Sequence, residues 1–144
     1  LLGELNNKSC LTLRTSIIGH ELCSSNSLIE WFLSSQKSIR GYSKAIYTGF
    51  PTVEIARILN ELIIPNKSLN GLLHLSTEPI NKYKLLKIVA NTYGHKIKIT
   101  PDENFVIDRS LDSTLFKSIT GYKPPSWNKL IQNMFDFHTS NGFI

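Results

Sequence analysis

Two adjacent residues with chemistry of their own, His20 and Glu21, follow a segment rich in β-branched residues that ends at Gly19. An imidazole beside a carboxylate suits general acid–base catalysis, because histidine exchanges protons near neutral pH. The same two side chains could instead cap a turn with their hydrogen bonds. Both interpretations are open, and turn capping is the one that the sequence favours.

The sequence gives little support for a metal site or for a glycine-rich phosphate-binding loop. The histidines (His20, His74, His95 and His138) fall in four different predicted elements, and Cys10 and Cys23 form no Cys-x-x-Cys pair. Such spacing is not that of a metal site. The sequence also has neither glycine-rich phosphate-loop motif and no Gly-x-Ser-x-Gly hydrolase elbow. We therefore expect no metal ligands and no dinucleotide loop within these residues.

Basic and aromatic residues alternate over a short segment, at Arg40, Tyr42, Lys44 and Tyr47. The net charge of the chain is +5, with 16 Lys and Arg against 11 Asp and Glu, which favours anionic partners. Interleaved basic and aromatic side chains are typical of nucleic-acid binding. An edge hairpin with exposed charges gives the same pattern, and we favour that interpretation because the other lysines are scattered.

The composition is that of a globular chain. Of its 144 residues, 41% are hydrophobic and 19% are charged, which is enough apolar material for the core of one domain. This balance excludes a disordered or low-complexity protein. No apolar run approaches the ~18 residues that a membrane-spanning helix needs.

Strand and helix patterns alternate along the chain, which favours an α/β fold with parallel strands. Strands are expected over 11–18, 38–42, 45–49, 72–75 and 96–100, and an apolar segment over 105–107 follows a turn at Pro101-Asp102. Helices are expected over 28–36, 53–63 after a Thr52 cap, 82–93 after an Asn81 cap, 113–119, and onward from a Ser126 cap.

Five segments, taken in chain order, carry a resemblance to a known family. They are Leu11-Thr12-Leu13-Arg14-Thr15-Ser16-Ile17-Ile18-Gly19, Asn26-Ser27-Leu28, Thr48-Gly49-Phe50-Pro51-Thr52-Val53-Glu54-Ile55-Ala56, Gly71-Leu72-Leu73-His74-Leu75-Ser76, and Asp108-Arg109-Ser110-Leu111-Asp112 with Thr120-Gly121-Tyr122-Lys123-Pro124. Together they resemble the extended short-chain dehydrogenases/reductases, and within them the branch similar to dTDP-4-dehydrorhamnose reductase.

The resemblance implies the C-terminal part of a Rossmann-like α/β protein. Residues 1–20 would be the end of the active-site helix and a core strand of the nucleotide-binding sheet. Residues 21–144 would be mainly a mixed α/β substrate-binding region with returning core elements. Leu1-Leu2-Gly3-Glu4 resembles the residues just after the catalytic Lys of the family. We therefore expect the catalytic Tyr and Lys and the dinucleotide loop upstream, and no turnover by the 144 residues alone.

The family passes a hydride from NAD(P)H to a keto carbon of a nucleotide-linked sugar, and a tyrosine donates the proton. The resemblance implies that Thr15, Ser16 and Ile17 line the nicotinamide and the sugar, at the carboxyl end of a strand. Rhamnose reductases commonly have Trp where this chain has Ile17, which leaves the sugar open. The choice between NADH and NADPH is open as well.

Three further residues would bind the nucleotide-diphosphate sugar. Asn26 would hydrogen-bond its diphosphate or base, Arg109 would pair with diphosphate oxygens, and Lys44 would add positive charge. Each also has a simpler interpretation: a helix N-cap for Asn26, an ion pair with Asp108 or Asp112 for Arg109, and a solvated charge for Lys44.

Three functions follow from these expectations. The first is a sugar-nucleotide reductase; the second is an epimerase or dehydratase of the same superfamily, with His20 and Glu21 as acid–base candidates. The third is a non-catalytic sugar-nucleotide-binding or regulatory protein. We expect a cytoplasmic protein of polysaccharide biosynthesis without nucleic-acid or membrane partners, and the resemblance allows a homodimer at full length.

Overall fold

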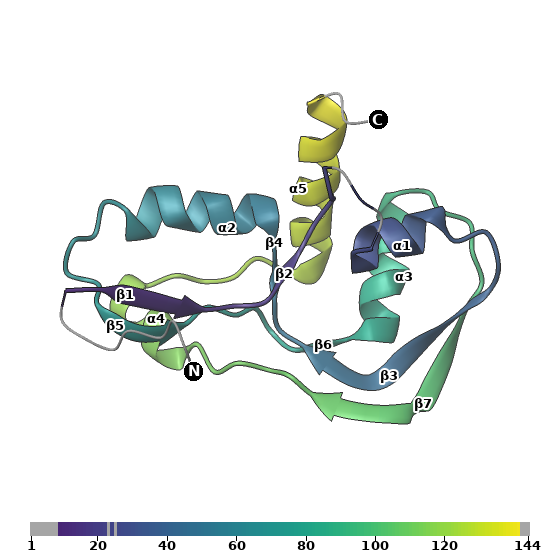
Figure 1. Cartoon of the computed structure of the whole chain (residues 1–144), viewed down its shortest axis with the longest axis horizontal. Helices are drawn as coiled ribbons and strands as arrows, with labels where there is room; N and C mark the ends of the chain where they lie inside the picture. Colours follow the sequence, from purple (N-terminus) through teal and green to yellow (C-terminus); the bar gives the residue numbers. More distant parts are fainter. Residues whose placement is uncertain (1–8, 23, 25, 142–144) are drawn as a thin grey trace.

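The computed structural model describes residues 9–22, 24 and 26–141. Strands and helices alternate along this part of the chain, as predicted (Figure 1). In order they are β1 (Leu11–Arg14), β2 (Ile17–Ile18), α1 (Leu28–Ser34), β3 (Ile39–Tyr47), β4 (Phe50–Pro51), α2 (Thr52–Ile58), the π-helical turn η1 (Leu59–Ile63), β5 (Gly71–His74), β6 (Ile80–Asn81), α3 (Lys82–Thr92), β7 (Ile99–Asp108), α4 (Thr114–Thr120) and α5 (Trp127–Ser140).

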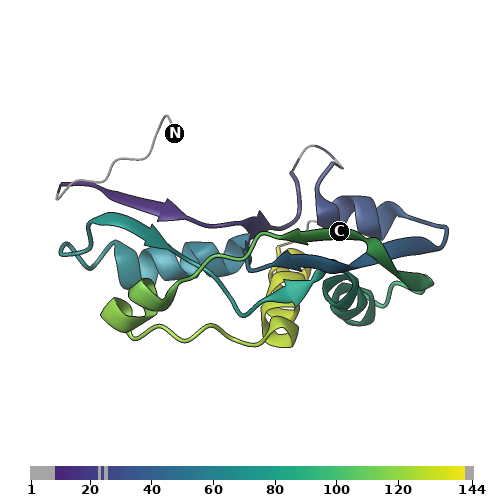
Figure 2. The same cartoon turned by 90° about the horizontal axis from the view of Figure 1, so that it is seen from below.

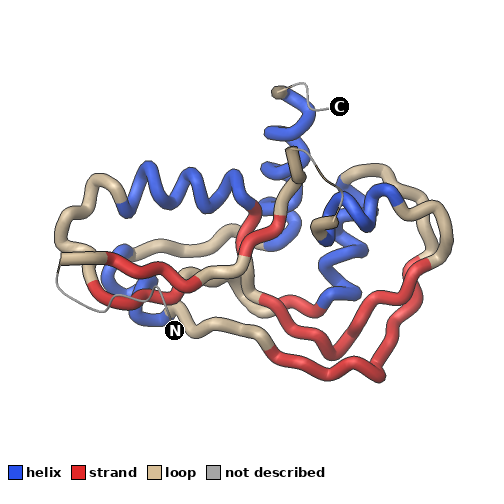
Figure 3. Tube along the Cα trace, viewed as in Figure 1, coloured by secondary structure: helices blue, strands red, loops and turns tan. Residues whose placement is uncertain are grey.

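The strands form three small sheets. β1 pairs with β5 and β2 pairs with β4, both in parallel. In the third sheet β3 is the middle strand, antiparallel to β6 and parallel to β7. Figure 3 shows these strands along one side of the molecule, with α1, α2, α3 and α5 on the other. The predicted α/β class with parallel strands is confirmed.

The single strand expected over residues 11–18 is instead two strands with different partners. Leu13 of β1 lies opposite Leu73 of β5, whereas Ile17 of β2 lies opposite Phe50 of β4. The chain changes partner between the two strands, at Thr15 and Ser16, and a continuous run of strand-forming residues does not reveal such a change. Within the described residues, β5 is the only strand that pairs with β1.

The sequence predicted an interruption in each of two strands of the third sheet, and both predictions are wrong. Residues 39–47 form one strand, so the edge hairpin expected around Arg40 and Tyr42 does not exist. Its neighbours β6 and β7 come from distant parts of the sequence, which local patterns do not specify. β7 likewise continues through the turn expected at Pro101-Asp102, because an edge strand tolerates a proline without N–H. Gly41 lets β3 approach α3, since a Cβ there would lie 2.9 Å from the Cα of Tyr83.

The helix boundaries follow the capping residues. Asn81 and Ser126 cap α3 and α5 through their side chains, as predicted, and accept from the backbone N–H groups of Lys84 and Lys129. Thr52 does not cap α2: it is the first residue of the helix, and Pro51 occupies the N-cap position.

Helix α5 joins the two ends of the elongated molecule. It packs against α2 on one side and against α3 on the other (Figures 1 and 2). Leu130 and Ile131 of α5 are fully buried in one hydrophobic core, together with Ile58 of α2 and Leu85 and Val89 of α3. This continuous core fixes the third sheet and its helices relative to the first two strand pairs.

Candidate functional site

A cavity of about 350 Å³ lies where β3, β7, α1 and the start of α3 meet. Its walls are mostly apolar and aromatic, and they include Trp31 of α1, Tyr42 of β3 and Phe105 of β7. Its charged side chains are Arg40, Lys82 and Arg109, and all three are basic. Binding sites for small molecules often combine apolar walls with a few convergent polar groups. This cavity is therefore the candidate functional site.

Lys82 and Arg109 approach each other in this cavity. Lys82 is the first residue of α3, and its ammonium lies 4.5 Å from the ring centroid of Tyr47. Arg109 comes directly after β7, where its backbone N–H donates to the carbonyl oxygen of Ile46. Burial lowers the pKa of Lys82, and the nearby Arg109 charge lowers it further. Both effects mean that the site disfavours its own positive charge.

Within the described residues, no carboxylate forms an ion pair with Lys82 or with Arg109. The ion pairs found there involve other residues. The two aspartates expected as partners of Arg109 serve turns instead. The Asp108 carboxylate accepts from the N–H of Ser110 at 2.8 Å, and Asp112 accepts from the N–H of Thr114 at 2.8 Å. Hydrogen bonds from the side chains of Ser110 and Thr114, and after them these backbone N–H groups, lower the pKa of both aspartates.

The third basic residue of the cavity is already paired. Arg40 lies 3.3 Å from the carboxylate of Asp102, which is buried. Beside it, the rings of Tyr42 and Phe105 lie 5.0 Å apart and are about half exposed. Exposed ring faces of this kind can stack on a planar group. The cavity thus offers uncompensated positive charge at one part of its wall and aromatic surface at another.

The residues expected beside the nicotinamide lie together at the junction of β1 and β2. Ser16 lines the cavity, and its carbonyl oxygen accepts from the N–H of Phe50 at 2.8 Å. Thr15 and Ile17 do not line the cavity, and the side chain of Ile17 is half exposed. Ser16 and Arg109, which lie far apart in the sequence, therefore share one cavity.

Asn26 and Lys44 lie outside the cavity. Ser27 is the N-cap of α1, so the simple capping interpretation of Asn26 is wrong. The backbone N–H of Asn26 donates to the Glu21 carboxylate at 2.8 Å. The ammonium of Lys44 lies 3.1 Å from the carboxylate of Glu103, and both side chains are largely exposed.

His20 and Glu21 do not form the acid–base pair considered from the sequence. Glu21 accepts from the hydroxyl of Ser24 at 2.6 Å as well as from Asn26, which confirms the turn-capping interpretation for Glu21. The ring of His20 instead contacts Glu30 and Tyr93.

Lys82 was not predicted as a site residue, although the sequence contains a signal for it. Two lysines, Lys82 and Lys84, fall in the first turn of α3, which has no acidic residue there. The N-terminus of a helix carries partial positive charge and normally favours acidic side chains. A lysine immediately after a clear N-cap is therefore an unfavourable placement that points to an anionic partner.

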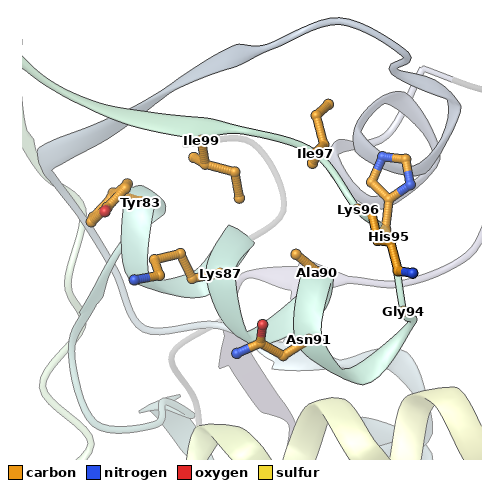
Figure 4. A pocket seen from close by; sticks show the side chains of 9 residues that line it. All are labelled: Tyr83, Lys87, Ala90, Asn91, Gly94, His95, Lys96, Ile97 and Ile99. Carbon is orange, nitrogen blue, oxygen red and sulfur yellow. The ribbon is translucent and has the colours of Figure 1, made fainter.

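A second hollow, of about 440 Å³, lies between α3 and the segment that leads into β7 (Figure 4). Its two lysines, Lys87 and Lys96, lie at opposite ends of it (Figure 4). Lys87 also lies 5.5 Å from the ring centroid of Tyr83. Because its charges do not converge, this hollow is a weaker candidate for binding an anion.

The described residues contain neither a metal-binding cluster nor a membrane-spanning helix. No three His, Cys, Asp or Glu side chains in residues 9–22, 24 and 26–141 are placed to hold a metal ion. Among the helices of the same residues, none has the length and apolar character needed to cross a membrane.

Comparison with known proteins places the fold. The sequence matches no protein-family model and no curated protein. Among solved structures, the dTDP-4-dehydrorhamnose reductase of Clostridium acetobutylicum is similar, with a TM-score of 0.71, 16% identity and coverage of 90% of this chain and 49% of that one. The corresponding reductase of Bacillus anthracis, in complex with NADP, has a TM-score of 0.68 and 17% identity, and covers 90% of this chain and 48% of that one.

An epimerase is similar to nearly the same degree. The UDP-N-acetylglucosamine 4-epimerase of Methanobrevibacter ruminantium, in complex with UDP-N-acetylmuramic acid, has a TM-score of 0.67 and 16% identity. The match covers 91% of this chain and 46% of the epimerase. The chain thus spans a little under half the length of these structures. Its fold is similar to part of the fold of these reductases and this epimerase, which confirms the predicted Rossmann-like α/β class.

Proposed function

We propose that the cavity between β3, β7, α1 and α3 binds the diphosphate of a nucleotide sugar, and that this chain is the substrate-binding part of an NAD(P)-dependent sugar-nucleotide reductase. The observation that carries the proposal is the pair of cations, Lys82 and Arg109, without an acidic partner in the described residues. A diphosphate supplies the missing negative charge.

The two cations suit different parts of this task. The guanidinium of Arg109 presents a planar set of N–H donors that matches two phosphate oxygens, whereas the Lys82 ammonium acts as a compact charge. Lys82 is held over the ring of Tyr47, so its position is partly fixed before the ligand arrives. Little ordering of Lys82 is then needed on binding, which favours affinity.

The aromatic part of the cavity suits the remainder of the ligand. Tyr42 and Phe105 lie on neighbouring strands with their rings about half exposed. We place the nucleobase against these rings, because stacking on an aromatic face is available to any base. The sugar then extends toward Ser16, which lines the same cavity.

The residues present fit only one end of a nicotinamide cofactor. Thr15, Ser16 and Ile17 lie at the ends of parallel strands, where ligands of open α/β sheets bind. The sequence has no glycine-rich loop for the cofactor's phosphates. NAD(P)H would supply the hydride, while the residues of this chain hold the sugar in place.

An epimerase is the second candidate, and the comparable likeness to the Methanobrevibacter ruminantium enzyme favours it. A reductase is preferred because Glu21 is occupied by its turn, so the acid–base pair that the epimerase alternative invoked is not formed. As part of the same proposal, the full-length protein acts in the cytoplasm on a precursor of polysaccharides, and a dTDP-linked keto sugar is its substrate.

Titration of the 144-residue chain with dTDP, UDP and inorganic phosphate tests the binding proposal. We expect chemical shift changes at Arg109, Lys82 and Phe105 with either nucleoside diphosphate, and a much weaker response to phosphate. Lys44→Ala is the matched control, because Lys44 is a cation of β3 that pairs with Glu103 and does not line the cavity. Binding that survives Arg109→Ala with Lys82→Met but is lost with Lys44→Ala would place the ligand elsewhere.

A further inference from the structure

The loop that carries Arg109 into the candidate site is held on both sides of that residue. It runs from Arg109, directly after β7, to Ser113, directly before α4. On the first side, the backbone N–H of Arg109 donates to the carbonyl oxygen of Ile46 at 3.2 Å. On the second side, both backbone groups of Leu111 are bound by side chains from other parts of the chain. The loop is therefore restrained where its cation leaves the backbone.

The two side chains that bind Leu111 are buried hydroxyl groups. The N–H of Leu111 donates to the hydroxyl oxygen of Thr48 at 2.9 Å, and its carbonyl oxygen accepts from the hydroxyl of Ser76 at 2.8 Å. Thr48 follows β3 and Ser76 lies two residues after β5, and they are only 1% and 2% exposed. A buried hydroxyl is costly unless it is hydrogen-bonded, so both groups favour this position of the loop. We call these two hydroxyl groups the Leu111 clamp.

The part played by Thr48 follows from the way in which the β3–β7 ladder ends. The bond from the Arg109 N–H to the Ile46 carbonyl continues the parallel ladder between the two strands. By the same pattern, the next N–H, that of Leu111, would donate to the carbonyl of Thr48. That carbonyl already accepts from the backbone N–H of Thr77 at 2.9 Å. The Thr48 hydroxyl replaces it as the acceptor for Leu111, and the loop thus stays attached beyond the last paired residue.

The position that the loop gives to Arg109 is electrostatically unfavourable in the free protein. Arg109 and Lys82 line the same cavity, and like charges repel. Burial lowers the pKa of Lys82, and the Arg109 charge lowers it further, so the two cations interact. A flexible loop would let Arg109 move away from Lys82 into solvent. The clamp restrains the backbone from which the guanidinium extends and so opposes that movement.

We propose that Thr48 and Ser76 are positioning residues, which hold the loop of Arg109 so that both cations of the cavity reach one diphosphate. This inference rests on the proposed function and assigns a further pair of residues to it. Neither Thr48 nor Ser76 lines the cavity, so each acts through the backbone of Leu111 and not by touching the ligand. A loop that is ordered before the ligand arrives has less freedom to lose on binding, which favours affinity.

The chain offers matched variants for this proposal. Thr48→Val removes the hydroxyl at nearly constant volume, whereas Thr48→Ser keeps it. Thr77→Val is the control, because Thr77 is also buried and its hydroxyl donates to the carbonyl of Gly49 at 3.2 Å. Each valine variant loses one buried hydrogen bond, so both should lower stability. Only Thr48→Val removes a bond to Leu111.

Calorimetric titration with dTDP, at a temperature where every variant is folded, gives the first readout. We expect Thr48→Val to weaken binding by about three- to tenfold, and Thr48→Ser and Thr77→Val to weaken it by less than about twofold. In an Arg109→Ala background, Thr48→Val should cause no further loss, because it acts through Arg109. An equal loss in that background, or in Thr77→Val, would overturn the proposal.

The pKa of the Lys82 ammonium in the free chain, measured by NMR, gives a second readout that needs no ligand. Without the Thr48 hydroxyl, Arg109 can withdraw from Lys82. We therefore expect Thr48→Val to raise the pKa of Lys82 toward its value in Arg109→Ala. Thr48→Ser and Thr77→Val should leave that pKa unchanged. A Lys82 pKa that is the same in Thr48→Val as in the unmodified chain would also overturn the proposal.

Failure of this inference and failure of the proposed function give different results. If the unmodified chain does not bind dTDP, the proposed function is wrong, and the pKa of Lys82 still decides whether the clamp positions Arg109. If dTDP binds normally and Thr48→Val has no effect on affinity, only the role of the clamp is wrong. Should Thr48→Val not fold, Ser76→Ala takes its place with the same expected results, since it removes the other hydroxyl of the clamp.

Discussion

Two charged clusters of this protein differ in how their charges are balanced. Glu54 of α2 is only 3% exposed, yet its carboxylate accepts from Arg57 at 2.6 Å and from the Tyr122 hydroxyl at 2.7 Å. Lys82 and Arg109 also approach each other in a partly buried place, but within the described residues no carboxylate lies within ion-pair distance of either.

This difference in charge balance distinguishes a cluster that stabilises the fold from a cluster that can bind a ligand. The Glu54 cluster is satisfied internally and joins α2 to the segment between α4 and α5, so it stabilises the fold and has little left to offer a ligand. Its hydrogen bonds raise the pKa of Arg57, whereas burial, together with the Arg109 charge, lowers that of Lys82. A fold that leaves two cations together without a partner loses stability, and a bound anion restores it.

The largest expected effect is on the structural cluster. Glu54→Ala removes the acceptor of both Arg57 and Tyr122, and we expect the free energy of unfolding to fall by about 2–3 kcal/mol. The value is below that of a fully buried pair because 42% of the Arg57 side chain is exposed and can be hydrated again. Urea unfolding measures it. Glu61→Ala, which removes only the exposed partner of Arg57, is the control and should change stability by less than about 0.5 kcal/mol.

The next effect is on the binding cluster. Arg109→Ala should weaken binding of a nucleoside diphosphate by about 1–3 kcal/mol, the value of a lost charged hydrogen bond, and leave the unfolding free energy nearly unchanged. Calorimetric titration together with urea unfolding separates the two quantities. If stability falls and affinity stays, Arg109 has a structural role and the contrast between the clusters fails.

A smaller effect is expected from the aromatic wall. Phe105→Ala removes one of the two rings that lie 5.0 Å apart, and affinity for the nucleoside diphosphate should fall by about 0.5–1.5 kcal/mol. Affinity for inorganic phosphate should not change, since phosphate has no ring to stack. If the affinities for the nucleoside diphosphate and for phosphate fell equally in the same titration, Phe105 would act only through the surroundings of the two cations and not by stacking on the base.

The smallest expected effect shows whether the charge of Lys82 lowers or raises the stability of the fold. Lys82→Met keeps the side-chain length but removes a desolvated cation from a helix N-terminus, so we expect the unfolding free energy to rise by about 0.3–1 kcal/mol. Thermal or urea unfolding at neutral pH detects this change. A clear loss of stability would mean that the contact between the Lys82 ammonium and the Tyr47 ring outweighs its desolvation.

Local patterns in the sequence predicted most of the helices. Side-chain caps at Asn81 and Ser126 set the starts of α3 and α5, and both features are encoded within a few residues. The strands were harder to predict because pairing joins distant segments. Residues 39–47 form the single strand β3, which pairs with both β6 and β7. Residues 11–18 form two strands because β1 pairs with β5 whereas β2 pairs with β4.

Only part of the candidate site could be predicted from the sequence, again because the site is formed by segments that lie far apart in the chain. The resemblance implied Ser16 and Arg109, and the structure places both in one cavity, although their roles there remain predictions. Asn26 and Lys44 fall outside it, and Lys82 and Phe105 were missed. Lys82 enters the site because the residues before Lys82 and Arg109, Asn81 and Asp108, both lie opposite Ile46 of β3, a relation that only the folded chain creates.

The pKa of the Lys82 ammonium, measured by NMR with and without bound dTDP, tests the central claim most directly. The free protein should show a pKa below the ordinary lysine value of 10.5, because of burial and Arg109. A diphosphate between the two cations should raise that pKa, and by linkage the affinity for dTDP should decrease as pH rises through the lower, free value. A pKa of Lys82 that does not move when dTDP binds would contradict the account.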